Sequence, residues 1–223
     1  MNSQELAKLI DHTLLYSDAK STEIEKLCEE AVEYGFASVC VQPYYVKLAA
    51  EKLQGTAVKV CTVIGFPLGQ NKTATKVFEA REAIADGASE LDMVINLAAL
   101  KNADWVTVEA DIKAVVEAAG GLTVKVILEC SMLSELEVIK ASAIARRAGA
   151  DFVKTSTGFQ GRGATVDDIE RMNTASGSPV LVKASGGIRD YATALAMVEA
   201  GASRIGTSSG VIIMEEARRA EEA

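Results

Sequence analysis

Lys154 is the residue whose type and setting most clearly suggest chemistry. It ends a short apolar run, Phe152 and Val153, and small hydroxyl residues and Gly158 follow it. An amine at the end of an apolar strand is poorly hydrated, which disfavours its charged form. The neutral amine can then attack a carbonyl carbon. The alternative is a lysine whose ammonium simply reaches solvent from the end of a strand. The pattern therefore predicts a candidate imine-forming nucleophile.

Three further charged residues occupy comparable positions. Asp92, Lys125 and Lys183 each lie in or at the end of an apolar segment that is typical of a buried strand. A second ammonium beside an amine lowers the pKa of that amine, so Lys183 is expected to activate Lys154, although the spacing also permits the reverse. Asp92 is expected to relay protons through water; its alternative is an ion pair that merely neutralises a lysine.

Two loops rich in glycine and serine form a candidate anion site. Residues 184–190 follow one expected strand, residues 206–210 follow the next, and each loop leads into a helix. Backbone amides and a helix N-terminus bind phosphate in such places, and a guanidinium adds charged donors. Such loops are often only helix starts, but two after neighbouring strands favour a phosphate site. The candidate groups are Gly186, Gly187, Arg189, Ser208 and Ser209.

The single histidine and the cysteines are weaker candidates. His12 lies beside Asp11 and could act as a base, but such a residue is more often a hydrogen-bonded wall residue. Cys40 ends an expected strand and could line the pocket, although a buried structural thiol is more common. The four cysteines are widely spaced without a CxxC pair, so neither a metal site nor a disulfide framework is indicated, and a cytoplasmic location is expected.

The elements that must position these residues recur along the chain. Eight apolar segments indicate strands, at residues 9–15, 37–41, 59–64, 90–95, 123–128, 152–154, 179–183 and 204–207. The expected helices cover residues 3–10, 21–34, 43–53, 72–86, 104–119, 134–148, 165–174, 190–200 and 210 onward. Near-continuous apolar strands that alternate with helices predict an α/β fold, a (β/α)8 TIM barrel with a short N-terminal helix. The alternative, an open doubly wound sheet, usually has fewer strands and a dinucleotide-binding glycine turn.

Length and charge limit the class of protein. The 223 residues fit one barrel domain spanning residues 1–223, because such barrels commonly need ~200–250 residues. The net charge of -8 disfavours nucleic acid and anionic membrane surfaces as partners. The first residues lack the pattern of a secretion signal, and no apolar run approaches the ~18 residues of a membrane span. A small-molecule partner is therefore expected.

Three segments of the chain closely resemble the deoxyribose-phosphate aldolase family. They are residues 90–96 (ELDMVIN), 154–159 (KTSTGF) and 183–189 (KASGGIR), and the resemblance runs from about residue 10 to residue 209. It implies a class I aldolase that reversibly cleaves 2-deoxyribose 5-phosphate to glyceraldehyde 3-phosphate and acetaldehyde. It further implies that the enzyme needs no metal or organic cofactor, takes a sugar phosphate as its partner and forms a homodimer or homotetramer.

The resemblance also implies a role for each candidate residue. Lys154 would form the Schiff base, Lys183 would lower the pKa of that lysine, and Asp92 would relay protons. The substrate phosphate would lie against Gly158, Gly186, Gly187, Arg189, Ser208 and Ser209, and the pocket would be lined by Thr157, Lys125 and Cys40.

Two features depart from the pattern of some family members. Phe159 stands where some carry a lysine, which removes one phosphate contact. Some also end in a tyrosine that reaches the site, whereas Tyr191 is the last tyrosine here, so the proton step would depend more on Asp92 and ordered water. The remaining alternatives are a sugar-phosphate isomerase or different lyase that uses no imine, and a non-enzymatic binding barrel, against which both lysines and Asp92 argue.

Overall fold

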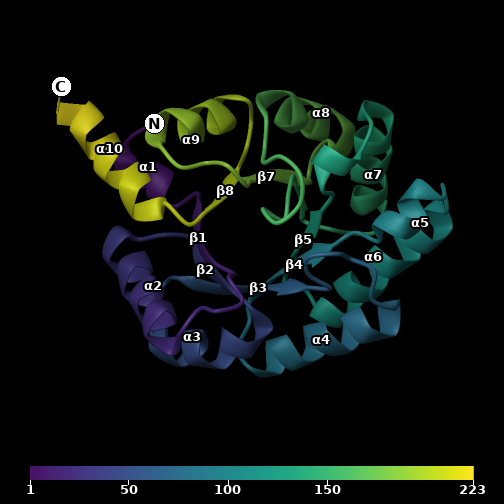
Figure 1. Ribbon diagram of the computed structural model, residues 1–223, viewed down its shortest axis with the longest axis horizontal. Coiled ribbons are helices and arrows are strands. Elements are labelled where there is room, and N and C mark those ends of the chain that lie inside the picture. The colour runs from purple at the N-terminus through teal and green to yellow at the C-terminus, as the bar shows by residue number, and fades with distance from the viewer. Residues whose placement is uncertain (223) are drawn as a thin grey trace.

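Eight parallel strands close into a barrel that is surrounded by helices in the computed structural model, which describes residues 1–222 (Figure 1). The strands pair in sequence order and β8 returns to β1, which confirms the predicted (β/α)8 barrel. Ala223, the last residue of the predicted domain, lies outside the described residues. The strands are β1 (Ile10–Leu14), β2 (Ser38–Val41), β3 (Lys59–Ile64), β4 (Glu90–Val94), β5 (Thr123–Ile127), β6 (Phe152–Lys154), β7 (Leu181–Ser185) and β8 (Arg204–Thr207).

The helices form the outer layer and cover the apolar outer face of the strands (Figure 1). Within residues 1–222, every helix is too short or too polar to cross a membrane. The α-helices are α1 (Ser3–Ala7), α2 (Ser21–Tyr34), α3 (Val46–Lys52), α4 (Thr73–Ala85), α5 (Leu97–Lys101), α6 (Trp105–Ala119), α7 (Glu135–Arg147), α8 (Val166–Ser176), α9 (Tyr191–Glu199) and α10 (Gly210–Glu222). Two short 3-10 helices, η1 (Pro43–Tyr45) and η2 (Cys130–Met132), complete the set of helical segments.

Local sequence explains where these helices begin and what they bury. Ser134 caps α7 in a reciprocal pair with Glu137, so two backbone amides of the first turn that lack helical partners find acceptors. In α2, Ile24, Leu27 and Ala31 recur at helical spacing and are buried in the core. Burying one such large aliphatic side chain contributes about 1.5–3 kcal/mol, so this apolar stripe fixes α2 against the barrel.

The structure differs from the predicted elements at several boundaries. Helix α1 ends at Ala7, not at residue 10, and the helix predicted at residues 43–53 is divided into η1 and α3. Strand β7 is Leu181–Ser185, later than predicted, because the ladder starts when Leu181 donates its amide to Asp151. The 3-10 helix η2 and helix α5 were not predicted; α5 has a single turn that Asn96 caps by accepting a hydrogen bond from Ala99. Both segments are too short to show an apolar periodicity. These differences move no strand out of its order around the barrel.

The strand register brings the charged candidates together inside the barrel. Asp92 on β4 pairs with Lys125 on β5, and Lys154 on β6 pairs with Lys183 on β7. Alternate residues of a strand share one face, so Glu90 lies on the same inward face as Asp92. The closed sheet thereby collects charges that are far apart in the sequence.

Lys76 on α4 joins helix α6 to the end of β4 through a fully buried ion pair and a hydrogen bond. Its ammonium donates to Asp111 on α6 at 2.6 Å and to the carbonyl of Val94 at 2.9 Å. Lys76→Met is expected to lower the free energy of unfolding by about 3 kcal/mol, because it leaves a buried carboxylate without its cation. Urea denaturation measures this change. The control Lys113→Met, at an exposed lysine, should change it by less than about 0.5 kcal/mol, and equal effects would contradict the assignment.

Candidate active site

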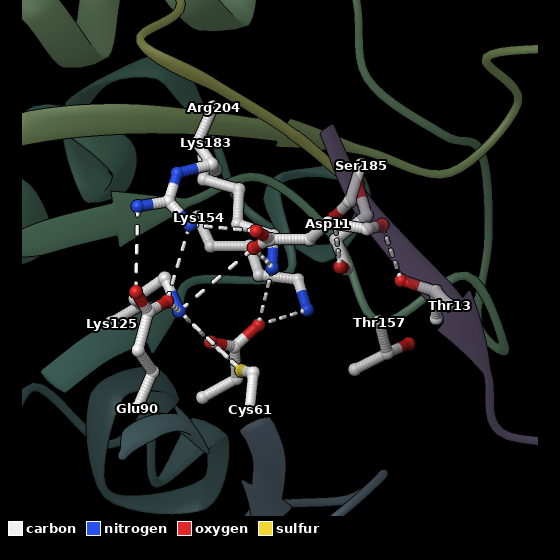
Figure 2. Close-up of polar contacts among 12 residues, drawn as sticks. Asp11, Thr13, Cys61, Glu90, Lys125, Lys154, Thr157, Lys183, Ser185 and Arg204 are labelled. Carbon is white, nitrogen blue, oxygen red and sulfur yellow. Dashed lines mark hydrogen bonds and ion pairs between the residues drawn. The ribbon is translucent and has the colours of Figure 1, made fainter. Parts of the chain in front are cut away.

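A cluster of seven charged side chains occupies the inside of the barrel (Figure 2). Each member makes at least one ion pair with another member, and all but Arg204 are buried. We call this group the ion-pair cluster. It consists of the carboxylates Asp11, Glu90 and Asp92 and the cations Lys125, Lys154, Lys183 and Arg204.

Asp92 is the centre of the ion-pair cluster. Its Oδ2 atom accepts hydrogen bonds from the ammonium groups of Lys154 at 2.7 Å and Lys183 at 2.8 Å. Its Oδ1 atom accepts from Lys125 at 2.9 Å and from the thiol of Cys61 at 3.1 Å. Because Lys154 and Lys183 share one oxygen atom, their nitrogens lie no further apart than the sum of those two distances. The two lysines therefore converge on one point.

Lys183 is held in its charged form. Burial disfavours its ammonium, but Asp11 and Asp92 outweigh that effect and raise its pKa above the ordinary lysine value. Gly206 makes room for this arrangement, since a Cβ atom there would lie 3.0 Å from Cε of Lys183. A permanent cation therefore stands next to the amine of Lys154.

The carboxylate of Asp92 is held in its ionised form. Burial disfavours the charge, but the three lysine partners outweigh it and hold the pKa of Asp92 well below its usual range. The pKa of Asp11 is also lowered, because Lys183, Lys125 and Arg204 overcome the effect of burial. Asp92 can thus hold an ammonium and receive a proton, but it stores none at neutral pH.

A pocket of about 170 Å³ opens above the ion-pair cluster at the carboxyl ends of the strands. Lys154 is the member of the cluster that lines this pocket within residues 1–222, and its side chain is 4% exposed. The same pocket is lined by the predicted residues Thr157, Gly158, Gly186, Gly187, Arg189 and Ser208. The structure therefore brings the candidate nucleophile and most of the candidate phosphate groups into one cavity.

Three predicted pocket residues lie elsewhere. Lys125 does not line the pocket, because its ammonium is drawn below Asp92 by Glu90 at 2.6 Å. Cys40 is fully buried beside Cys61, on the neighbouring strand, and likewise does not reach the pocket. Ser209 is not among the lining residues; its amide instead donates to the hydroxyl of Thr207 at 2.9 Å. Sequence position identified the right strands and loops but not the depth of each side chain.

The candidate phosphate loops, after β7 and β8, have a conformation that their glycines allow. Gly186 and Gly187 have φ angles of 82° and 78°, in the region that residues with a side chain rarely adopt. A Cβ atom at Gly163 would lie 2.0 Å from the carbonyl oxygen of Gly186, so the loops after β6 and β7 can approach closely. Helix α10 begins at Gly210 directly behind Ser208, and its N-terminus faces the pocket end of the barrel.

Two other sequence candidates are now placed. Phe159 lines the pocket and packs edge to face on Phe66, with ring centroids 5.2 Å apart, so this position supplies an apolar wall. His12 contacts Glu30 at 2.7 Å on the helix side of the sheet and takes no part in the pocket lining. His12 is therefore a buried, hydrogen-bonded residue of the barrel wall, which was expected from the sequence as the more common alternative to a catalytic base.

Sequence reasoning missed four charged residues of the site. Asp11, Glu90 and Arg204 belong to the ion-pair cluster, and Glu129 contacts Thr157 beside the pocket. The available signal for Glu90 was its position two residues before Asp92, on the same face of the strand. For Asp11 and Arg204, the equivalent signal was a charged residue within a predicted strand.

Comparisons with known proteins identify relatives of this chain. Residues 6–215 match the model of the DeoC/LacD family aldolase. Deoxyribose-phosphate aldolase 1 of Bacillus licheniformis is 59% identical over 214 residues, which cover 96% of each chain. Deoxyribose-phosphate aldolase of Streptococcus pneumoniae serotype 2 is 58% identical over 94% of this chain and 96% of that protein.

A solved structure extends the similarity to three dimensions. The deoxyribose phosphate aldolase of Aeropyrum pernix, described as a tetramer, superposes with a TM-score of 0.90 at 38% identity and covers 96% of this chain and 91% of that one. Both the family match and these identities extend over nearly the whole barrel. This chain therefore belongs to the DeoC/LacD family of aldolases.

Proposed function

We propose that this chain is a deoxyribose-phosphate aldolase, which cleaves 2-deoxyribose 5-phosphate reversibly to glyceraldehyde 3-phosphate and acetaldehyde through a Schiff base on Lys154. The observation that carries the proposal is that Lys154 belongs to the ion-pair cluster and also lines the pocket. The high identity to enzymes of that name supports the choice of substrate.

The charge balance of the ion-pair cluster favours a neutral Lys154. The cluster holds four cations and three carboxylates, so it carries one excess positive charge when every lysine is protonated. Lys154 makes one ion pair, whereas Lys183 and Arg204 each make two. An excess charge in a buried site is costly, and loss of a proton from Lys154 removes it with the fewest broken ion pairs.

A neutral amine in this place leads to carbon–carbon bond cleavage. The amine of Lys154 adds to the C1 aldehyde, and loss of water leaves an iminium ion that withdraws electrons. Removal of the proton on the C3 hydroxyl then turns C3 into a carbonyl, and the electrons of the C2–C3 bond pass into an enamine. Protonation at C2 and hydrolysis release acetaldehyde. We assign Lys183 to keeping the amine neutral and Asp92 to holding it and receiving protons through water.

Turnover distinguishes this function from the other sugar-phosphate chemistries. Purified protein is mixed with 2-deoxyribose 5-phosphate, and acetaldehyde and glyceraldehyde 3-phosphate are measured by separate coupled reactions. The proposal predicts that both products form in equal amounts and that the reverse reaction consumes both. Conversion of the substrate to an isomer, or binding of the phosphate ester without turnover, would contradict it.

Arg189 is expected to bind the substrate phosphate. It is exposed and lines the pocket beside the loop of Gly186 and Gly187. A hydrogen bond to a charged group contributes about 1.5–3 kcal/mol, so Arg189→Met should raise KM for 2-deoxyribose 5-phosphate about 10- to 100-fold and change kcat little. Unphosphorylated 2-deoxyribose is the control substrate, since its KM should not change. A similar rise in KM with both sugars would show that Arg189 does not bind the phosphate.

We further propose that the protein is a homodimer or homotetramer and acts in the cytoplasm. The tetrameric relative supports the assembly, and four buried free thiols among residues 1–222 suit a reducing compartment. Sedimentation equilibrium gives the mass in solution, and a species of 23.5 kDa at micromolar concentration would contradict the assembly.

A further inference from the structure

Glu129 is a buried carboxyl group that the mechanism above leaves unused. It lies after β5, separated from Ile127 by Leu128; its side chain is fully buried, and it makes no ion pair within residues 1–222. Its backbone has a φ of 59°, in the left-handed region that a residue with a side chain occupies at a cost of about 1–2 kcal/mol. Strain of this kind persists where the surrounding structure demands one position of the side chain.

The carboxyl group is directed at the wall of the pocket. Its Oε2 atom makes a hydrogen bond with the hydroxyl of Thr157, and the amide of Thr157 lies 3.3 Å from the same oxygen. Thr157 lines the pocket next to Lys154, three residues earlier in the chain. The hydroxyl of Thr157 also accepts a hydrogen bond from the amide of Phe159 at 3.1 Å. A hydrogen-bonded path therefore runs from Glu129 through Thr157 to the pocket.

We propose that Glu129 is the proton store of this active site and exchanges protons with the bound substrate through the hydroxyl of Thr157. The inference rests on the proposed aldolase function and assigns the proton transfers of its dehydration and hydration steps to Glu129 and Thr157. When the carbinolamine on Lys154 loses water, Thr157 gives its hydroxyl proton to the departing oxygen and Glu129 gives its own proton to Thr157. The nitrogen lone pair forms the C=N bond, and the products are an iminium ion, water and the carboxylate of Glu129. In the final hydrolysis, the attacking water loses its proton along the same path in reverse.

The surroundings of Glu129 and Asp92 shift the pKa values of the two carboxyl groups in opposite directions. Burial raises the pKa of Glu129; the hydrogen bonds from Thr157 and the charge of Lys154 oppose burial without cancelling it. The charged groups of the neighbouring elements are Lys154 on β6 and the Arg162–Asp168 pair beyond Cys130. Asp92 is instead held as a carboxylate. Two carboxyl groups with divergent pKa values can take separate acid and base roles.

The deciding variant is Glu129→Gln, which keeps a side chain of the same size and its hydrogen bond to Thr157 but carries no exchangeable acid proton. General acid catalysis contributes about 10²–10⁴-fold, so the rate of imine formation, followed by borohydride trapping after mixing, should fall at least about 100-fold while KM changes little. The fall in wild-type rate at high pH, where the acid is ionised, should disappear in the variant. Glu135→Gln, at an exposed glutamate on α7, is the control and should keep the wild-type rate.

Stability supplies a readout independent of turnover. The folded-state pKa of Glu129 is raised, so its ionisation favours the unfolded chain as pH rises above the unfolded value near 4.3. Glu129→Gln removes that penalty. The melting temperature of the variant should match the wild type at about pH 4 and should exceed it at pH 8, with the difference arising between the unfolded-state and folded-state pKa values of Glu129. A variant that melts below the wild type at pH 8 would overturn the buried-acid assignment.

Thr157 variants test the path itself. Thr157→Val removes the relaying hydroxyl and should slow imine formation about as much as Glu129→Gln. Thr157→Ser keeps a hydroxyl, so its rate of imine formation should be at least tenfold higher than that of the valine variant. The double variant Glu129→Gln/Thr157→Val should be no slower than either single variant, since members of one path are not additive. Additive losses, or a Glu129→Gln rate within about threefold of the wild type, would overturn the relay. If wild-type protein also trapped no adduct on Lys154, the aldolase function itself would fail.

Discussion

Lys154→Met is expected to lower kcat/KM for 2-deoxyribose 5-phosphate by about 10⁵-fold and to abolish imine formation, because removal of a covalent nucleophile costs on that order. Methionine keeps an unbranched chain of similar volume, so the packing of β6 is retained. Three cations and three carboxylates remain in the variant, the same charge balance that a neutral Lys154 leaves in the wild type. Its free energy of unfolding should therefore equal or exceed that of the wild type.

Two measurements check this separation of activity from stability. Steady-state kinetics gives the loss of activity, and urea denaturation gives the free energy of unfolding. Retention of more than about 1% of the activity would exclude Lys154 as the nucleophile. A loss of more than about 2 kcal/mol in stability would show instead that Lys154 is chiefly a structural cation of the cluster.

Lys183→Met is expected to give the opposite result in stability. Lys183 is fully buried and pairs with both Asp11 and Asp92, so its removal takes one buried ion pair from each of these carboxylates. The free energy of unfolding should fall by about 3 kcal/mol, which corresponds to a melting temperature lower by about 6–12 °C for a chain of this size. The rising limb of the pH–rate profile should also move to higher pH, because the ammonium that repels a proton from the neighbouring amine is lost.

The comparison of the two lysine variants is best made at neutral pH. The pKa values of Asp11 and Asp92 are lowered, so the stability that they contribute is complete above about pH 4 and is lost as pH falls further. Those of Lys183 and Lys125 are raised, so their contribution is complete below about pH 10 and is lost above it. At pH 7, equal stability of the two variants would contradict the proposal that Lys183, with two buried ion pairs, stabilises the cluster more than Lys154, with one.

Much of the fold and part of the site were predictable from local sequence. Apolar strands alternating with glycine-terminated helices predicted the barrel, and strand order then made Lys154 and Lys183 neighbours. The loops after β7 and β8 were predicted to form a phosphate site because glycines and a helix N-terminus leave a local signal. Gly186, Gly187 and Ser208 line the pocket as those loops suggested.

The rest of the site depends on contacts across the barrel that leave no local signal. Asp11 contacts Lys183, which is 172 residues away in the chain, and the pair exists because β8 closes against β1. Lys125 was predicted to line the pocket, yet Glu90 and Asp92 hold its ammonium below the pocket. Glu129 lies just beyond a strand end in a left-handed conformation, so its buried position follows from the tertiary structure alone.

The most direct measurement of the central claim is to trap the covalent intermediate. The protein is incubated with 2-deoxyribose 5-phosphate or acetaldehyde, reduced with borohydride and digested, and the modified peptide is identified by mass spectrometry. Reaction through an imine on the pocket lysine predicts one stable adduct on Lys154, together with loss of activity in proportion to labelling. An adduct on Lys183 or another lysine, or full activity without any adduct, would contradict this account.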